Sequence, residues 1–146
     1  MSGIIVGVEG SGHSRRALDW AIHEAAIRHA PLTVLTVHQV MRTFWAGSMI
    51  YPEDTELAEN ARKMAQDETD EALGKLAEDA RPPKVTVLGV PGFPAEAILA
   101  VAKDADMIVV GSRGAGGFAG LLMGSVASQV THHAHCPVVI IPAGNA

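Results

Sequence analysis

The sequence predicts an α/β protein with a single open sheet of five parallel strands between layers of helices. Three observations predict it. Short apolar runs rich in β-branched residues alternate with longer helical patterns. The runs are continuously apolar, as in strands buried on both faces. Glycine-rich turns follow the first and fourth runs. A chain of 146 residues can bury a proper core, so we expect one domain over residues 1–146.

Five apolar runs have the length of buried strands. Pro31 introduces the second run, and the others are also bounded by turn residues such as Gly and Pro. The expected strands are Ile4–Val8, Leu32–Val37, Val85–Val90, Met107–Val110 and Val138–Ile141.

Four stretches between these strands have helical patterns. The first has alanines at i+4 spacing, and Ser14 is placed to cap it. The second has an apolar stripe opposite a charged face. Its stripe is Leu57, Ala61, Met64, Ala72 and Leu76. The expected helices run from Ser14 to about His29, from about Glu53 to Ala80, from Pro94 to Lys103 and from Ser125 to His133.

Gln39–Pro52 is the only long segment that we expect to be irregular. It holds three of the chain's six Trp, Tyr and Phe residues, namely Phe44, Trp45 and Tyr51. Loops of this length are usually functional or disordered. Two roles stay open: packing on the body or on a partner, and a lid near a ligand.

Composition excludes several classes of protein. The net charge is −5, from 11 basic and 16 acidic residues, which argues against a nucleic-acid binder. No apolar stretch is long enough for a membrane span. The first residues show neither a basic region nor a cleavage site, so we expect a cytoplasmic protein. Cys136 is the only cysteine, which rules out an intramolecular disulfide.

The most specific motif is Gly111-Ser112-Arg113-Gly114, followed after nine residues by Gly124-Ser125. It lies between an expected strand and an expected helix. Glycines at these two points let backbone N–H groups approach an anion, and the helix dipole adds positive potential. In an open parallel sheet, ligands bind beyond the carboxyl ends of the strands, where the winding reverses. The turn at Glu9–Gly12 should face the same crevice, so the sequence predicts a phosphate site there.

Two common phosphate motifs do not fit. A P-loop places a lysine on the terminal phosphates, but no lysine lies between Gly111 and Gly124. A dinucleotide-binding turn needs a third glycine, and Arg15 occupies that position. Hydrolysis needs a positioned base or an arginine-type stabiliser, and none is evident. We therefore expect slow turnover or none.

Two further clusters have ordinary interpretations. His132, His133 and His135 beside Cys136 resemble a metal cluster, but adjacent helical residues point about 100° apart. Histidines at a helix C-terminus are favoured by its dipole. Glu9, Ser11 and His13 could be drawn as a triad, but they are too close in sequence for that geometry, and the chain has no G-x-S-x-G elbow. Trp20 is expected in the core or at an interface.

Essentially the whole chain resembles the universal stress protein family, in particular its ATP-binding branch. The matching segments are Ile4–Ser11, Ala17-Leu18, Ile108–Gly114, Gly124–Val126 and His135–Ile141. The resemblance implies an open five-stranded parallel sheet in the order 3-2-1-4-5, the adenine nucleotide α-hydrolase-like architecture. It also implies ATP, with Mg²⁺, at the carboxyl edge.

The resemblance assigns the glycine motif to the ribose and phosphates. Gly111 and Gly114 would lie along the ribose and phosphates, with Gly124 and Ser125 on the β- and γ-phosphates. Val126 would flank the same turn. The anion would then be held by N–H groups, a hydroxyl and a helix N-terminus, helped by Mg²⁺.

The resemblance assigns the first two strands to the base and ribose. Val37 would offer backbone groups to the adenine edge, and Gly7 and Val8 would line the base pocket. Arg113, the only basic residue of the glycine motif, is expected among the nucleotide-binding residues as well. Glu9 stands where the family usually has Asp, and the extra methylene shifts its carboxylate by about 1.5 Å. Glu9 would lie near an Mg²⁺ ion that is held by the nucleotide. The resemblance implies no metal site formed by protein residues alone.

The resulting hypothesis is an ATP-binding, homodimeric stress-response regulator or sensor with little or no hydrolysis. The dimer would form through Val138, Val139, Ile140 and Ile141, an apolar edge that would otherwise invite uncontrolled pairing. One alternative is a receptor for AMP or cyclic AMP. Another is a slow ATPase or nucleotidyl transferase of the related α-hydrolase type. Ser11-Gly12-His13-Ser14 lacks the second glycine and the aspartate of that enzyme loop.

Overall fold

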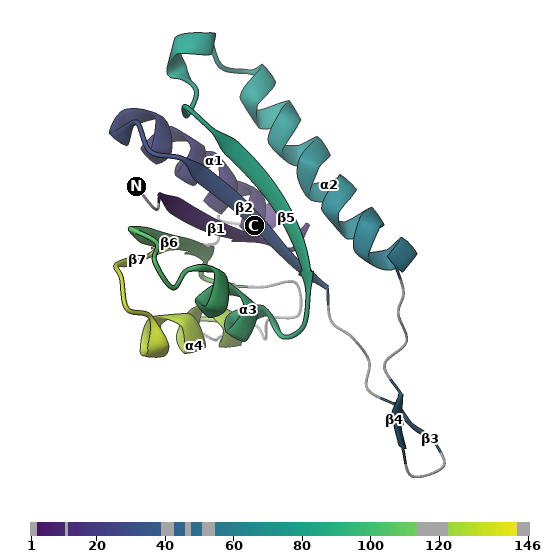
Figure 1. The fold of residues 1–146 in the computed structure, drawn as a ribbon. Coiled ribbons are helices and arrows are strands. Elements are labelled where there is room, and N and C mark those ends of the chain that lie inside the picture. The colour runs from purple at the N-terminus through teal and green to yellow at the C-terminus, as the bar shows by residue number, and fades with distance from the viewer. Residues whose placement is uncertain are drawn as a thin grey trace.

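The computed structural model describes residues 3–10, 12–38, 43–45, 48–50, 55–113 and 123–142 (Figure 1). Its elements, in chain order, are β1 (Ile4–Val8), α1 (Gly12–Arg28), β2 (Leu32–His38), β3 (Thr43–Trp45), β4 (Ser48–Ile50), α2 (Thr55–Gly74), the 3₁₀ turn η1 (Glu78–Ala80), β5 (Val85–Pro91), α3 (Pro94–Val101), β6 (Met107–Gly111), α4 (Ser125–His133) and β7 (Val138–Ile141).

The central sheet has the order β5–β2–β1–β6–β7, and every neighbouring pair is parallel. Counted along the chain, its strands stand in the predicted order 3-2-1-4-5. The centre is β1, where Ile4 pairs with Leu32 of β2 on one side and Met107 of β6 on the other. The winding therefore reverses between β1 and β6, and the carboxyl ends of all five strands meet at one edge.

Helices cover both faces of the sheet (Figure 1). Ile4, Val6 and Val8 point into a core that they share with α1 and α2. Ile5 points to the other face, into a core formed with α3 and α4. Because alternate residues of β1 enter opposite cores, both sets must be apolar, which explains the continuous apolar run. No helix of the described ranges is long and apolar enough to cross a membrane.

Three helix boundaries differ from the prediction. The first helix begins at Gly12, so Ser14 lies inside it and is not its cap. The Ser14 hydroxyl instead accepts a hydrogen bond from the Glu9 N–H at 3.2 Å, which fixes the turn from β1 into α1. The helix α2 ends at Gly74, a residue that favours helix termination, and Glu78–Ala80 forms a separate 3₁₀ turn. The helix α3 ends at Val101, two residues early.

The buried stripe of α2 includes Ala72 as predicted, with Leu76 packed against it, but it departs from the prediction at Met64. Met64, predicted in the core, is 55% exposed, and the adjacent Ala65 is buried. The stripe continues through Thr69 and Ala72. Thr69 is fully buried because its hydroxyl donates to the Ala65 carbonyl at 2.7 Å. Because Thr69 is polar, the apolar pattern of the sequence does not mark it as part of the buried stripe.

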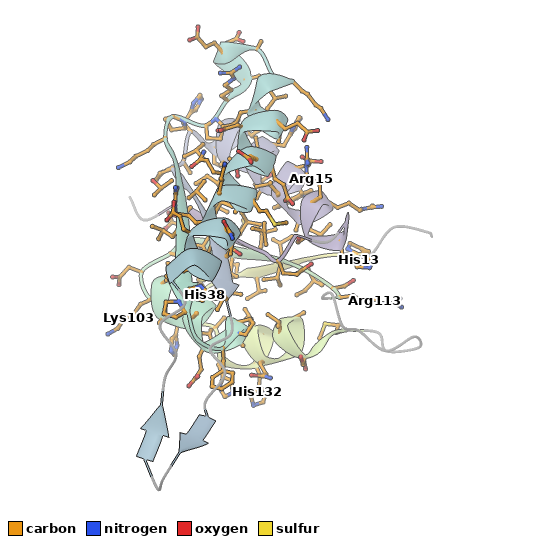
Figure 2. The ribbon with its side chains drawn as sticks, turned by 90° about the vertical axis from the view of Figure 1, so that its right-hand side faces the viewer. His13, Arg15, His38, Lys103, Arg113 and His132 are labelled. Atoms are coloured by element: carbon orange, nitrogen blue, oxygen red, sulfur yellow. The ribbon has the colours of Figure 1, made fainter. Side chains whose placement is uncertain are left out.

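Part of Gln39–Pro52 has regular structure, so the prediction of an irregular segment is wrong there. The strands β3 and β4 pair antiparallel, with Thr43 opposite Ile50 and Trp45 opposite Ser48. Figures 1 and 2 show this hairpin standing away from the five-stranded sheet. The aromatic side chains of the segment lie outside what the structure describes.

Gly3 gives a stability test of the strand entrance. Its φ is +82°, and a β-carbon there would overlap the Pro31 carbonyl oxygen. Its N–H donates to Asp106 Oδ2 at 2.9 Å, and its carbonyl accepts the Asp106 N–H at 2.8 Å. We expect Gly3→Ala to lower the free energy of unfolding by about 2 kcal/mol or more in chemical denaturation.

Gly74→Ala is the matched control for this substitution. A β-carbon at Gly74 meets nothing within 4 Å, and the residue ends a helix. Its unfolding free energy should stay unchanged or rise by up to about 1 kcal/mol. Equal stability of the two variants would contradict the assigned backbone constraint.

Candidate functional site

The turns after β1 and β6 come together at the carboxyl edge of the sheet. A β-carbon at Gly111, the last residue of β6, would lie 3.3 Å from the His13 carbonyl oxygen and 3.4 Å from that of Arg113. Figure 2 shows His13 and Arg113 on the same side of the molecule. Glycine at position 111 thus allows the exit of β6 to approach the start of α1.

The start of α4 is attached to this same edge. The N–H of Gly124 donates to the Ser112 carbonyl, and the Ser112 N–H donates to the Ile141 carbonyl at 2.8 Å. Gly124 is the N-cap of α4, and no side chain of the described residues caps the helix. The N–H groups of Ser125, Val126 and Ala127 have no acceptor within the helix. They can therefore bind an anion.

The structure brings most of the predicted site residues to one edge. Gly111 ends β6, and Arg113 comes two residues later. Gly124 is the N-cap of α4, and Ser125 and Val126 are its first two residues. Glu9 leaves β1 next to them, and Val37 lies near the end of β2, the neighbouring strand. Gly114 and Ser11 lie outside the described residues. The roles of all these residues toward a nucleotide stay predictions.

Gly7 and Val8 lie at this edge, Gly7 half-buried and Val8 buried, and both adjoin the protein's own core. A β-carbon at Gly7 would be 3.0 Å from Ile98 Cδ1, so the absence of a side chain lets α3 pack closely on β1. Val8 is 5% exposed and points to the opposite core. Contact with a base at these two positions would therefore involve their backbone.

An acidic cluster flanks the turn after β1. Arg15 Nη2 lies 3.5 Å from Glu71 Oε1, and Arg15 Nε lies 3.6 Å from Asp19 Oδ1. Burial lowers the pKa of Arg15, but the hydrogen bond and charge of Glu71, with Asp19 and Glu68, outweigh it and raise the pKa overall. Arg15 is thus committed to carboxylates of α1 and α2.

Glu68 is the carboxyl group of this cluster whose pKa is raised. Burial raises its pKa above the ordinary 4.5, and the negative charges of Glu9 and Glu71 add to the rise. The charge of Arg15 acts in the opposite direction and offsets only part of it. Negative charge is therefore disfavoured beside Glu9.

The histidines near the end of α4 show no metal geometry. His132 and His133 meet edge to face, with ring centroids 4.9 Å apart. Within the part of the chain that the structure describes, no group of three or more His, Cys, Asp or Glu could hold a metal ion. Burial, followed by the charge of Asp106, raises the pKa of the Cys136 thiol, which makes it a poorer nucleophile at neutral pH.

Sequence reasoning missed two apolar residues at this edge. The predicted stripe of the second helix places Met64 in the core, and Phe93 is not among the predicted site residues. Phe93 is 48% exposed and is the N-cap of α3, where Ser, Thr, Asp or Asn would be usual. The sequence does hold one indication of a special role. Phe93 stands between Gly92 and Pro94 at a helix start, where an aromatic side chain cannot cap the helix.

The fold defines an α/β protein with an open parallel sheet whose winding reverses between β1 and β6, the point where ligands bind in such sheets. A sequence profile of the universal stress protein family matches residues 1–142. Rv2623 of Mycobacterium tuberculosis is 33% identical over 139 residues, which is 95% of this chain and 47% of that protein. Rv2624c of the same organism is 35% identical over 142 residues, 97% of this chain and 48% of that protein. The chain belongs to the universal stress protein family, and it spans about half the length of these curated relatives.

Solved structures agree with the fold. A universal stress protein from Lactobacillus plantarum is 25% identical, with a TM-score of 0.71 over 96% of this chain and 97% of that one. Another, solved in complex with cAMP, is 27% identical, with a TM-score of 0.66 over 95% and 94%. One from Archaeoglobus fulgidus, in complex with dAMP, is 25% identical, with a TM-score of 0.62 over 95% and 96%.

Glu68→Gln tests the electrostatics of the edge. Because the folded-state pKa of Glu68 is raised, the folded protein holds this proton more tightly than the unfolded chain. Its contribution to stability is complete below the ordinary pKa of 4.5 and is lost as pH rises through the folded value. Glu68→Gln should be more stable than the parent at neutral pH, and the difference should vanish as pH falls to that range. Denaturant titrations at several pH values measure it.

Glu71→Gln, one turn further along α2, is the control. Glu71 is 61% exposed and pairs with Arg15 and Lys75, so its loss should cost at most about 1 kcal/mol at neutral pH. The two variants should shift stability in opposite directions. A Glu68→Gln protein less stable than the parent at neutral pH would mean that attraction to Arg15 outweighs burial.

Proposed function

We propose that this protein binds ATP, carried with Mg²⁺, at the carboxyl edge of its sheet and acts as a stress-response regulator or sensor in the cytoplasm. The uncapped start of α4 beside the exit of β6 carries the proposal. Three N–H groups and the helix dipole point positive potential to one place. The likeness to universal stress proteins solved with cAMP and dAMP supports an adenine nucleotide as the ligand.

The described residues fit a metal ion that arrives on the nucleotide. Glu9 supplies a carboxylate at the edge, but no group of three or more possible ligands surrounds it in the described ranges. Mg²⁺ commonly keeps several waters and binds through substrate phosphates and one or two carboxylates. Glu9 would then act on the hydrated ion, while Gly111, Gly124 and Ser125 hold the phosphates.

The pairing of Arg15 near the edge supports slow hydrolysis or none. Fast phosphoryl transfer needs a positioned base and a cation that stabilises the transition state. Arg15 is held by Glu71 and Asp19, which makes it unavailable for that role. Backbone N–H groups bind phosphate well but do not activate water. The protein would therefore report nucleotide occupancy and would not consume ATP quickly.

Ser125→Ala tests the phosphate site. The hydroxyl is exposed at the first residue of α4 and would bond to a charged phosphate, so its loss should weaken MgATP binding about tenfold in calorimetry. Ser128→Ala, an exposed serine of the same helix, should bind as the parent does. Gly114 replaced by a bulky residue should also lose binding. If both the Ser125→Ala protein and the bulky Gly114 variant fold and bind MgATP with unchanged affinity, the proposed phosphate site is contradicted.

The identity of the nucleotide is a separate question, and cAMP or AMP is the second candidate because of the cAMP and dAMP complexes. Denaturing purified protein and separating any released nucleotide by chromatography identifies a resident ligand. Competition against labelled cAMP then ranks the candidates. Failure of ATP to displace cAMP would favour the second candidate, and an empty site with no affinity for either would refute the proposal.

We also propose a homodimer through β7. This strand ends the sheet, and its residues are all apolar. A shallow depression of about 490 Å³ runs between α1 and β7, lined by Arg16, Asp19, Trp20, His23, Glu24, Ile27 and Ile141. Ile27 within it is 69% exposed. An apolar edge beside an exposed apolar side chain favours pairing with a second copy.

Val139→Lys tests this dimer. A lysine on an edge strand blocks edge pairing, so light scattering should show a monomer. Because Val139 also packs against the core, the variant is compared only once circular dichroism shows that it is folded. Leu88→Lys places the same charge on β5, the opposite edge strand, at a side chain that is already 38% exposed. It should remain a dimer. A monomeric parent protein at micromolar concentration would refute the proposal.

A further inference from the structure

Large apolar side chains that reach solvent gather at the carboxyl edge of the sheet. Five such side chains are more than one-third exposed among the described residues: Ile27, Met64, Leu88, Phe93 and Met123. Three of them, Met64, Phe93 and Met123, are tied to strand exits at this edge. A hydrophobic surface concentrated at a ligand-binding edge indicates an apolar part of the ligand.

Phe93 stands beside the end of β2. The last residue of β5, Pro91, pairs with His38 of β2, and the Gly92 N–H donates to the His38 carbonyl at 3.0 Å. Gly92 has a φ of +131°, which turns the chain sharply before Phe93 begins α3. Phe93 therefore follows a sharp turn and stands at the start of α3, the helix that packs on one face of the sheet.

Met64 lies over the neighbouring exit, that of β1. A β-carbon at Gly10 would be 3.3 Å from Met64 Cε, so the methionine reaches across this turn. Gly10 has a φ of +89°, and a side chain there would be both strained and in contact with Met64. Met64 belongs to α2, which covers the opposite side of the sheet from α3.

The end of β2 lies between these two side chains. In the sheet, β2 stands between β1, whose exit lies under Met64, and β5, which leads to Phe93. Figure 1 shows α2 and the turn into α3 on opposite sides of the end of β2. A flat group placed beyond Val37 would have the thioether on one side and the aromatic ring on the other.

We propose that Met64 and Phe93 form the two apolar walls of the purine pocket and set its preference for the base. This inference rests on the proposed nucleotide site, whose phosphate end is the start of α4. Stacking on an aromatic ring contributes substantially to the binding of a base, and a methionine sulfur contacts aromatic rings favourably. The roles expected for Gly7 and Val8 then pass to residues outside the glycine motif.

The position of these side chains relative to the phosphate site favours a base over a protein partner. A base joined to phosphates at the start of α4 would lie over the carboxyl edge, near the ends of β1 and β2. A protein partner would need a continuous apolar surface. Arg15, Glu68 and Glu71 form a charged cluster on α1 and α2 beside Met64, which interrupts such a surface.

The experiment measures two ligands, MgATP and inorganic tripolyphosphate, by calorimetry with each variant. Phe93→Ala should weaken MgATP binding about tenfold and Met64→Ala several-fold, because each removes one wall. Tripolyphosphate has no base, so its affinity should not change. Leu88→Ala removes an exposed apolar side chain from the middle of β5 and should leave both affinities unchanged. Phe93→Leu keeps the bulk without the aromatic ring and should fall between Phe93→Ala and the parent.

The outcomes separate this inference from the proposed function. If the parent protein binds neither ligand, the proposed nucleotide site is refuted and the purine pocket with it. If the parent binds MgATP and the folded Phe93→Ala and Phe93→Leu proteins bind it equally well, only the purine pocket is refuted. An equal loss for MgATP and tripolyphosphate would also refute it, because the effect would then be on the phosphate end.

Discussion

The close approach of two backbones at Gly111 is the constraint on which the rest of the site depends. There the exit of β6 meets the start of α1, leaving no room for a longer side chain without a shift. The approach is possible because β1 and β6 are neighbours in register, with Ile4 opposite Met107. Gly124 then attaches α4 to the same exit through Ser112. The proposed phosphate site therefore depends on the pairing of strands whose apolar side chains lie in the two cores.

Much of this arrangement could be predicted from the sequence because strands such as Ile4–Val8 are apolar on both faces. The order of the strands followed from the family resemblance, and the shared edge from the parallel sheet. The errors arose where tertiary contacts override local pattern. Thr69 is polar yet fully buried, because it bonds to the Ala65 carbonyl, and this shifted the stripe of α2 away from Met64. Ser14 looked like a cap but serves the Glu9 N–H from inside the helix.

Charge at the edge is divided between two kinds of group. The proposed anion site consists of helix N–H groups and a hydroxyl, which carry no net charge. Ionised side chains nearby form ion pairs with one another, as Arg15 does with Glu71 and Asp19. Glu68 is left partly buried beside Glu9, which raises its pKa. Such an edge would suit a nucleotide whose charge is balanced by its own metal ion, because the nearby Arg15 is already paired with carboxylates.

A backbone phosphate site cannot by itself distinguish one nucleotide from another. Every nucleoside triphosphate presents the same phosphate oxygens to the start of α4. Selectivity would therefore come from elements that reach the base: Met64 of α2 lies against the exit of β1, and Phe93 follows the exit of β5. These side chains lie on segments whose sequence is not constrained by the phosphate contacts. A protein of this fold could thus change its base preference at positions 64 and 93 while the glycine motif stays the same.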